Sequence, residues 1–142
     1  MTLDELQNLA DKDLKINEEE LDLESLKTPQ LHNKYCKFHS KYKNLLKVSE
    51  QDLARITREK WEYYTGKADP SVYQSKPFNL KILKQDVDKY IKSDPDVNKL
   101  EQKVTYIQET VDYLEKTIKL ISNRGFTIKN AIDWRKFTSG VI

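Results

Sequence analysis

The sequence predicts an all-α fold of long antiparallel helices, including a C-terminal heptad helix, that assembles into a ring-like homo-oligomer. Apolar residues repeat with heptad spacing over residues 97–121, which is typical of a helix that faces a partner along its whole length. Only three glycines and four prolines occur among 142 residues, so the chain has few places to turn. The sequence has neither an apolar run near the ~20 residues of a membrane span nor a secretory signal pattern, so we expect a soluble protein without a membrane partner.

The heptad helix is expected over residues 95–123. Asp94 can cap its first turn, and Pro95 suits the first helical position, where a missing N–H is harmless. Gly125 is expected to end the helix, and Thr127 to begin a short last helix. Branched Val or Ile occupies each a position and Leu or Ile each d position. We expect this row to mediate oligomerisation: Val97, Leu100, Val104, Ile107, Val111, Leu114, Ile118 and Ile121.

A second apolar row on the same helix favours assembly above a dimer. Tyr106, Tyr113 and Leu120 recur every seven residues at the c position, about 100° from the d row. A helix with two apolar faces can pack against its own chain on one side and a neighbouring subunit on the other. A monomeric helical bundle remains the alternative.

The N-terminal half is expected to contain a short helix and a long one. Thr2 can cap a helix over residues 2–14, and the acidic stretch 17–27 is either a solvated connection or a second short helix. Thr28 and Pro29 are a helix start signal, and the apolar positions that follow predict a helix from about 29 to Tyr64, ended by Gly66. Ser49 interrupts the apolar row, so a new helix beginning there is the alternative.

The segment 67–79 is the clearest connector, because it contains Asp69-Pro70 and Lys76-Pro77. Asn79 can then cap a helix with Leu80, Leu83 and Val87 on one face. The length suggests a single helical domain, residues 1–142. We divide it into an N-terminal part, 1–94, and an oligomerisation part, 95–142.

The net charge of +2 conceals a strong asymmetry along the chain. Residues 1–28 carry nine acids and three bases, whereas residues 29–67 carry nine bases and four acids. No acid occurs between Pro29 and Ser49. A block of one sign makes a local field that attracts phosphates, so the basic helix is a candidate nucleic-acid site.

Catalysis is not indicated by any motif. His32 and His39 lie two helical turns apart, and neither a nucleophile–base pattern nor a glycine-rich phosphate loop occurs. The single Cys36 cannot form an intrachain disulfide, and no Cys/His spacing suggests zinc. We therefore expect a non-enzymatic protein without cofactor or metal.

The basic helix combines cations with aromatic rings. Cations that neutralise phosphates and rings that stack on bases are the parts of a sequence-tolerant single-strand site. Tyr35, Phe38 and Tyr42 lie on the apolar row and are expected in the core, but Trp61 lies off the row. The cations expected to bind nucleic acid are Lys41, Lys43, Lys47, Arg55, Arg58, Lys60 and Lys67.

Several short runs resemble the UvsY family, the recombination mediators of T-even-type bacteriophages. They are Lys60-Trp61-Glu62-Tyr63-Tyr64-Thr65-Gly66, Ser122-Asn123-Arg124-Gly125-Phe126-Thr127-Ile128-Lys129, Asp133-Trp134-Arg135-Lys136-Phe137, Asn33-Lys34-Tyr35 with His39-Ser40, and Asp94-Pro95-Asp96-Val97. Their order, their spacing and the chain length together extend the resemblance over essentially the whole chain.

The resemblance implies an accessory protein in the cytoplasm of the infected host. Such proteins bind single-stranded DNA, form hexamers or heptamers, and help load UvsX, a RecA-like recombinase, onto DNA covered by the phage single-strand-binding protein. In the family a basic pair before the Tyr-Tyr motif is tied to DNA binding, and here it falls on Arg58 and Lys60, with Lys and Arg exchanged and Glu59 between them. A helical scaffold without DNA binding is the alternative function.

Overall fold

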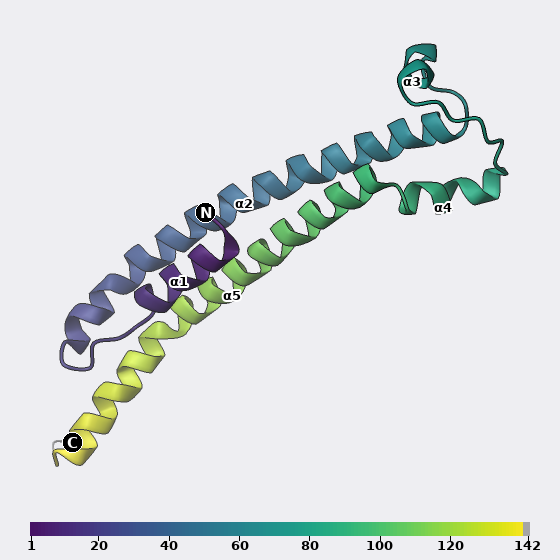
Figure 1. The fold of residues 1–142 in the computed structure, drawn as a ribbon. Coiled ribbons are helices and arrows are strands. Elements are labelled where there is room, and N and C mark those ends of the chain that lie inside the picture. The colour runs from purple at the N-terminus through teal and green to yellow at the C-terminus, as the bar shows by residue number, and fades with distance from the viewer. Residues whose placement is uncertain (141–142) are drawn as a thin grey trace. The chain divides into compact units, whose positions relative to one another are not determined.

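The structure is a computed structural model that describes residues 1–140, and within that range it contains helices and no strand (Figure 1). The elements are α1 (Leu3–Asp13), α2 (Leu21–Tyr64), α3 (Pro70–Ser75), the 3-10 helix η1 (Lys84–Asp86), α4 (Val87–Lys92) and α5 (Pro95–Thr138). The predicted all-α class is confirmed.

The chain forms two compact units, each containing part of α2 and part of α5. Unit 1 comprises Met1–Tyr42 and the chain from Glu109 onward, and unit 2 comprises Lys43–Gln108. The predicted single domain with parts 1–94 and 95–142 stays a prediction, since neither boundary is tested by these units.

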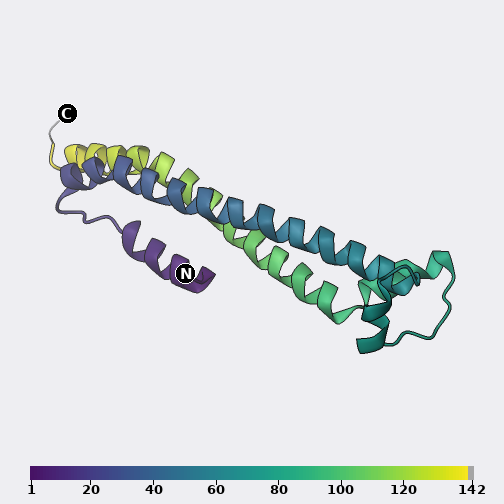
Figure 2. The same ribbon diagram turned by 90° about the horizontal axis from the view of Figure 1, so that it is seen from above.

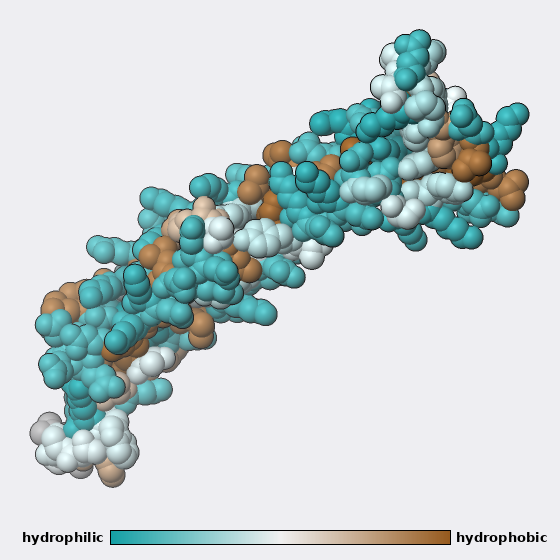
Figure 3. Space-filling view, viewed as in Figure 1, coloured by the Kyte–Doolittle hydropathy of each residue, from teal (hydrophilic) through white to brown (hydrophobic). Residues whose placement is uncertain are grey.

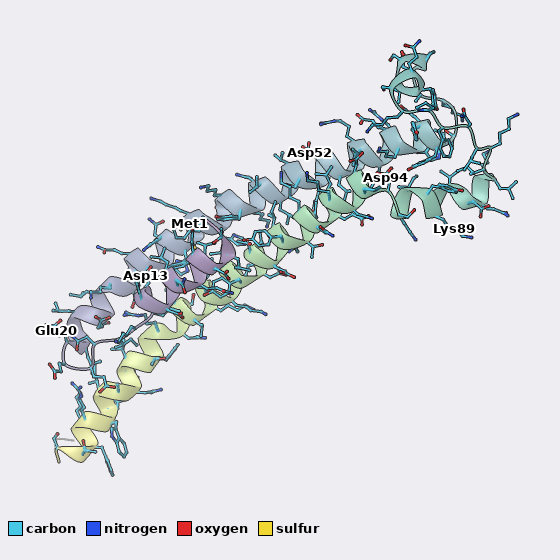
Figure 4. The ribbon with its side chains drawn as sticks, viewed as in Figure 1. Met1, Asp13, Glu20, Asp52, Lys89 and Asp94 are labelled. Atoms are coloured by element: carbon cyan, nitrogen blue, oxygen red, sulfur yellow. The ribbon has the colours of Figure 1, made fainter. Side chains whose placement is uncertain are left out.

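In unit 1, α1 packs against α2 and runs antiparallel to it. Tyr42 donates its hydroxyl proton to the Met1 carbonyl over 2.7 Å, while Lys34 and Tyr35 donate to Asp13 over 2.7 and 2.8 Å. Met1 and Asp13 therefore mark the two ends of α1 along α2 (Figure 4). The predicted Thr2 cap is confirmed as a capping box with Glu5.

Unit 1 also contains a buried ion pair between the two long helices. Arg124 of α5 donates to the Glu24 carboxylate over 2.5 Å, to the Glu24 carbonyl, and to the Thr28 hydroxyl over 2.9 Å. Arg124 and Glu24 are both buried. The pair fixes the first turns of α2 against α5, because a charge left alone at such a site would be costly.

Two predicted helix boundaries in unit 1 were wrong. We expected a start at Pro29, but α2 begins at Leu21 and Pro29 lies inside it. Likewise, α5 continues through Gly125 to Thr138 instead of ending and restarting at Thr127. Gly125 lacks the positive φ of a glycine that ends a helix. A glycine inside a helix lowers stability by only about 1 kcal/mol relative to alanine. Burial of Ile128, beyond Gly125, outweighs this cost and extends the helix.

In unit 2, the segments of α2 and α5 run antiparallel and side by side in both views (Figure 2). Val87, Ile91 and Val97 form a buried cluster, and Leu53 and Ile56 of α2 pack against it. Helix α2 passes through Ser49 without a break, so the prediction of one continuous helix is confirmed. Ser49 itself is buried.

The connection between the long helices differs partly from the prediction. Gly66 follows α2 with φ +76°, as expected for a glycine that ends a helix. The connector contains the short helix α3, which Asp69 caps by accepting from the Ser71 amide. The predicted helix from Asn79 was wrong: the chain is non-helical up to Leu83, and Leu80 and Leu83 are exposed. The ring of Phe78 packs among Tyr63, Tyr64 and Tyr90. This packing stabilises a non-helical conformation of the segment that follows it.

Candidate nucleic-acid interface

The seven predicted DNA-binding cations divide between the two units. Lys41 lies on α2 in unit 1, and the other six belong to unit 2. Six of the seven are exposed, the exception being Lys60. Within residues 1–140, Lys43 and Lys47 make no ion pair, so their charges are free to meet phosphates.

Lys60 is engaged in an ion-pair network. Its ammonium lies 2.9 Å from Asp96 and 3.4 Å from Asp94, and only 16% of its side chain is exposed. Burial opposes the charged form, but the hydrogen bond to Asp96 and the charges of both acids raise the pKa of Lys60 above its usual value. The DNA-binding role of Lys60 stays a prediction, and in this geometry Asp94 and Asp96 already neutralise its charge.

Asp94 is the centre of this network, at the junction of α4 and α5 (Figure 4). It accepts from the backbone amides of Asp96 and Val97 over 2.9 and 3.3 Å, which confirms the predicted cap of α5. The Tyr64 hydroxyl donates to it over 2.6 Å. Burial works against the carboxylate, yet the hydrogen bonds from Tyr64 and the amides, with the charge of Lys60, hold the pKa of Asp94 below its usual value.

Arg58 is the open member of the predicted basic pair. Its side chain is 68% exposed, and its Nε lies 3.8 Å from Glu62, a long and solvent-screened contact. Arg55 is similarly exposed and paired with Asp52 over 3.3 Å. Both guanidinium groups can exchange these weak partners for phosphates.

Spacing on α2 brings four residues of unit 2 to one flank of the helix. Lys43 and Lys47 are one turn apart, Arg58 follows Lys47 after about three turns, and Trp61 follows Arg58 after three residues. We call these four residues the cationic flank. Glu59 lies two residues from Trp61 and so points to the roughly opposite side of α2, away from the ring.

A pocket of about 580 Å³ lies at the end of the cationic flank, within unit 2. Trp61 and Tyr64 from α2, Lys67, and Phe78, Lys81 and Lys84 from the segment entering α4 are among its lining residues. Figure 3 shows hydrophobic side chains gathered over this segment, where Leu80 and Leu83 are exposed. The ammonium of Lys67 lies 4.6 Å from the centroid of the Trp61 ring, within the range of a cation–π contact.

Sequence reasoning missed part of this pocket. Lys81 and Lys84 were not among the predicted cations, and the α-helix predicted from Asn79 does not form at these two residues. Pro77 and the aromatic Phe78 were the available signals, since the residue before a proline leaves the helical region and Phe78 needs a buried site.

The eight heptad residues pack mainly within the single chain. Val97, Ile107, Val111, Leu114 and Ile121 are buried, while Leu100, Val104 and Ile118 are half-buried. Their predicted role in oligomerisation stays a prediction, since much of this row is already covered by the chain itself.

Apolar side chains remain exposed elsewhere on α5, in unit 1. Leu120 of the predicted c row is exposed, as are Phe126, Trp134 and Phe137. The Trp134 and Phe137 rings stack with centroids 5.8 Å apart, and Trp134 is 65% exposed. We call these four residues the exposed apolar row, and such a row is typical of a surface that meets another protein.

Residues 1–140 contain neither a candidate membrane span nor a candidate metal site. No helix there combines the length and apolar character needed to cross a membrane. The same residues contain no group of three or more His, Cys, Asp or Glu side chains that could hold a metal ion.

Comparison with known proteins identifies the family of this chain. A family described as "Recombination, repair and ssDNA binding protein UvsY" matches residues 9–141, and the chain belongs to this family. It is 26% identical over 141 residues to the "Recombination protein uvsY" of Enterobacteria phage T4, and the match covers 99% of each chain.

Solved structures give the same result. The lattice type II crystal structure of the bacteriophage T4 recombination mediator protein UvsY is 26% identical, with a TM-score of 0.86 and 98% of both chains covered. The lattice type I structure is 25% identical, with a TM-score of 0.84, and covers 94% of this chain and 98% of that one. The resemblance found in the sequence is therefore confirmed.

Proposed function

We propose that this chain is a homo-oligomeric recombination mediator, which binds single-stranded DNA and helps load a RecA-like recombinase of the UvsX type. It acts on DNA coated by the phage single-strand-binding protein, in the cytoplasm of the infected host. Family membership supports the class of function, and the name of the similar phage T4 protein supports the mediator role. The proposal assigns no catalysis to the chain.

The cationic flank is the observation that carries DNA binding. Lys43, Lys47 and Arg58 are exposed and lie on the same flank as Trp61. Cations along one flank neutralise successive phosphates, and the bound strand releases counterions in proportion. Lys67 extends this flank at the pocket, whereas Lys41 and Arg55 lie on the other flank of α2 and would bind phosphates there. Lys60 would first have to leave Asp94 and Asp96.

The exposed apolar row supports assembly, and the resemblance to the UvsY family implies a hexamer or heptamer. In a ring of subunits each flank contributes a few phosphate contacts to one strand, so weak sites add up through a high effective concentration. Bending the strand around such a ring would strain the contacts of the single-strand-binding protein and open DNA for the recombinase.

A salt series tests the proposal directly. Fluorescence anisotropy of labelled oligo-dT should show tight binding at low salt that weakens as salt rises. The double variant Lys43→Glu/Lys47→Glu should weaken binding and flatten the salt dependence, because it reverses two unpaired charges. The matched control is Lys116→Glu/Lys119→Glu, two exposed lysines of α5 in unit 1. If the full chain did not bind oligo-dT at low salt, the proposal would be wrong and the helical scaffold without DNA binding would be the remaining function.

A further inference from the structure

The pocket at the end of the cationic flank combines apolar walls with positive charge. Its volume of about 580 Å³ falls in the range of small-molecule sites. Lys67, Lys81 and Lys84 line it, and none of its lining residues is a carboxylate. The pocket therefore suits a flat, apolar group that carries negative charge at its edge.

Among the aromatic residues that line the pocket, Trp61 is the one whose ring is available for such a group. The other rings of the region pack on one another: Tyr63 stacks on Tyr73 with centroids 5.5 Å apart, and Tyr64 contacts Phe78 edge-on at 5.2 Å. Trp61 makes no such ring pair within residues 1–140 and is 39% exposed. Its indole can therefore stack on an incoming ring.

Lys67 lies over this indole on a flexible side chain. The cation–π contact is worth about 0.5–1 kcal/mol at an exposed site, and a phosphate offers the ammonium a stronger partner. A base that reaches the Trp61 ring brings its own phosphates, so the ammonium can leave the ring face and bind one of them. Trp61 and Lys67 can thus contact both parts of a nucleotide, the base and its phosphate.

We propose that this pocket holds one unstacked base of single-stranded DNA per subunit, stacked on Trp61, with Lys67, Lys81 and Lys84 on the neighbouring phosphates. The strand enters from the cationic flank, since Arg58 precedes Trp61 by three residues, less than one helical turn. This inference rests on the proposed single-stranded DNA binding and adds base contact to a surface otherwise limited to phosphates.

The test compares oligo-dT with a strand of equal length in which part of the nucleotides lack their bases. Anisotropy with the full chain should show tighter binding of the base-bearing strand. Trp61→Ala should weaken oligo-dT binding by roughly 5- to 150-fold for each stacked base while changing the abasic strand little. Trp61→Phe should restore most of the preference, because the smaller ring still stacks. Val72→Ala, at an exposed apolar residue of α3 outside the pocket, is the matched control.

The outcomes separate this inference from the proposed function. Equal binding of both strands by the wild-type chain would overturn the base pocket and leave DNA binding intact. An equal loss on both strands in Trp61→Ala would also overturn it, because the ring would then act on phosphate contacts alone. If Trp61→Ala bound both strands normally but lost recombinase, the pocket would belong to a protein partner. Absence of binding to either strand would overturn both proposals.

Discussion

The substitutions Arg58→Ala and Lys60→Ala should have different effects, although the two residues form one basic pair in the sequence. The Arg58 side chain is 68% exposed with one long contact to Glu62. The Lys60 side chain is 16% exposed and pairs with Asp94 and Asp96. We therefore expect Arg58 to contribute to DNA binding and Lys60 to contribute to the stability of unit 2.

The magnitudes follow from these environments. Arg58→Ala removes about one phosphate contact per subunit, so the slope of log K against log salt should fall by about 0.7 for each bound subunit. Its effect on stability should stay within about 0.5 kcal/mol. Lys60→Ala leaves the buried Asp94 carboxylate without its cation, which costs about 1–3 kcal/mol and lowers the Tm by roughly 4–12 °C.

Two assays on the same samples check this prediction. Anisotropy of labelled oligo-dT across a salt series gives the slope, and circular dichroism during heating gives the Tm. Lys99→Ala, at an exposed lysine of α5 in unit 2, should change neither the slope nor the Tm by comparable amounts. The reasoning would be refuted if Lys60→Ala flattened the slope at an unchanged Tm while Arg58→Ala bound DNA like the wild type.

Four further predictions concern stability and assembly. The folded-state pKa of Asp94 lies below its unfolded value, so its stabilisation is complete above about pH 4 and is lost as the pH falls through the folded pKa. In urea unfolding, Asp94→Asn should reduce the fall in the free energy of unfolding at acid pH. An unchanged fall would contradict the role of Asp94 in this pH dependence. Arg124→Met leaves the buried Glu24 carboxylate with Lys27 as its remaining cation and removes the hydrogen bonds from Arg124, so it should cost about 1–3 kcal/mol in chemical unfolding, whereas no measurable loss would argue against the buried pair. Leu120→Lys with Trp134→Lys should reduce the oligomer mass in mass photometry at unchanged helicity, and a full-size particle would exclude the exposed apolar row as the interface. Gly125→Ala, where an added Cβ meets no atom within 4 Å, should stabilise the chain by about 0.5–1 kcal/mol in thermal melts, and destabilisation would contradict the helical geometry at this residue.

The fold class was predictable because the sequence repeats its pattern over long stretches. Heptad spacing and the scarcity of glycine and proline determined the two long helices, and local capping chemistry determined the Thr2 and Asp94 caps. Helix ends were predicted less well, because a glycine or proline is a weak local signal. Burial of Ile128 outweighs Gly125, and contacts of Arg124 with Glu24 and Thr28 hold α2 helical around Pro29.

The candidate site was only partly predictable for a related reason. Helical spacing placed Lys43, Lys47, Arg58 and Trp61 correctly on one helix, since that needs only local geometry. The pairing of Lys60 with Asp94 and Asp96 joins residues more than 30 positions apart. No local pattern contains such a contact, so the sequence could not show that this cation is already neutralised.

The slope of log K against log salt for a long oligo-dT tests the central claim most directly, because it counts the phosphates that the assembled protein neutralises. The predicted cations other than Lys60 number six in each subunit, and Lys81 and Lys84 of the pocket bring the total to eight. At about 0.7 per phosphate, one subunit can reach a slope of only about −6. A mediator whose subunits share one strand predicts a clearly steeper slope. A slope of about −6 or shallower would contradict multivalent binding, and a slope near zero would contradict binding through the cationic flank altogether.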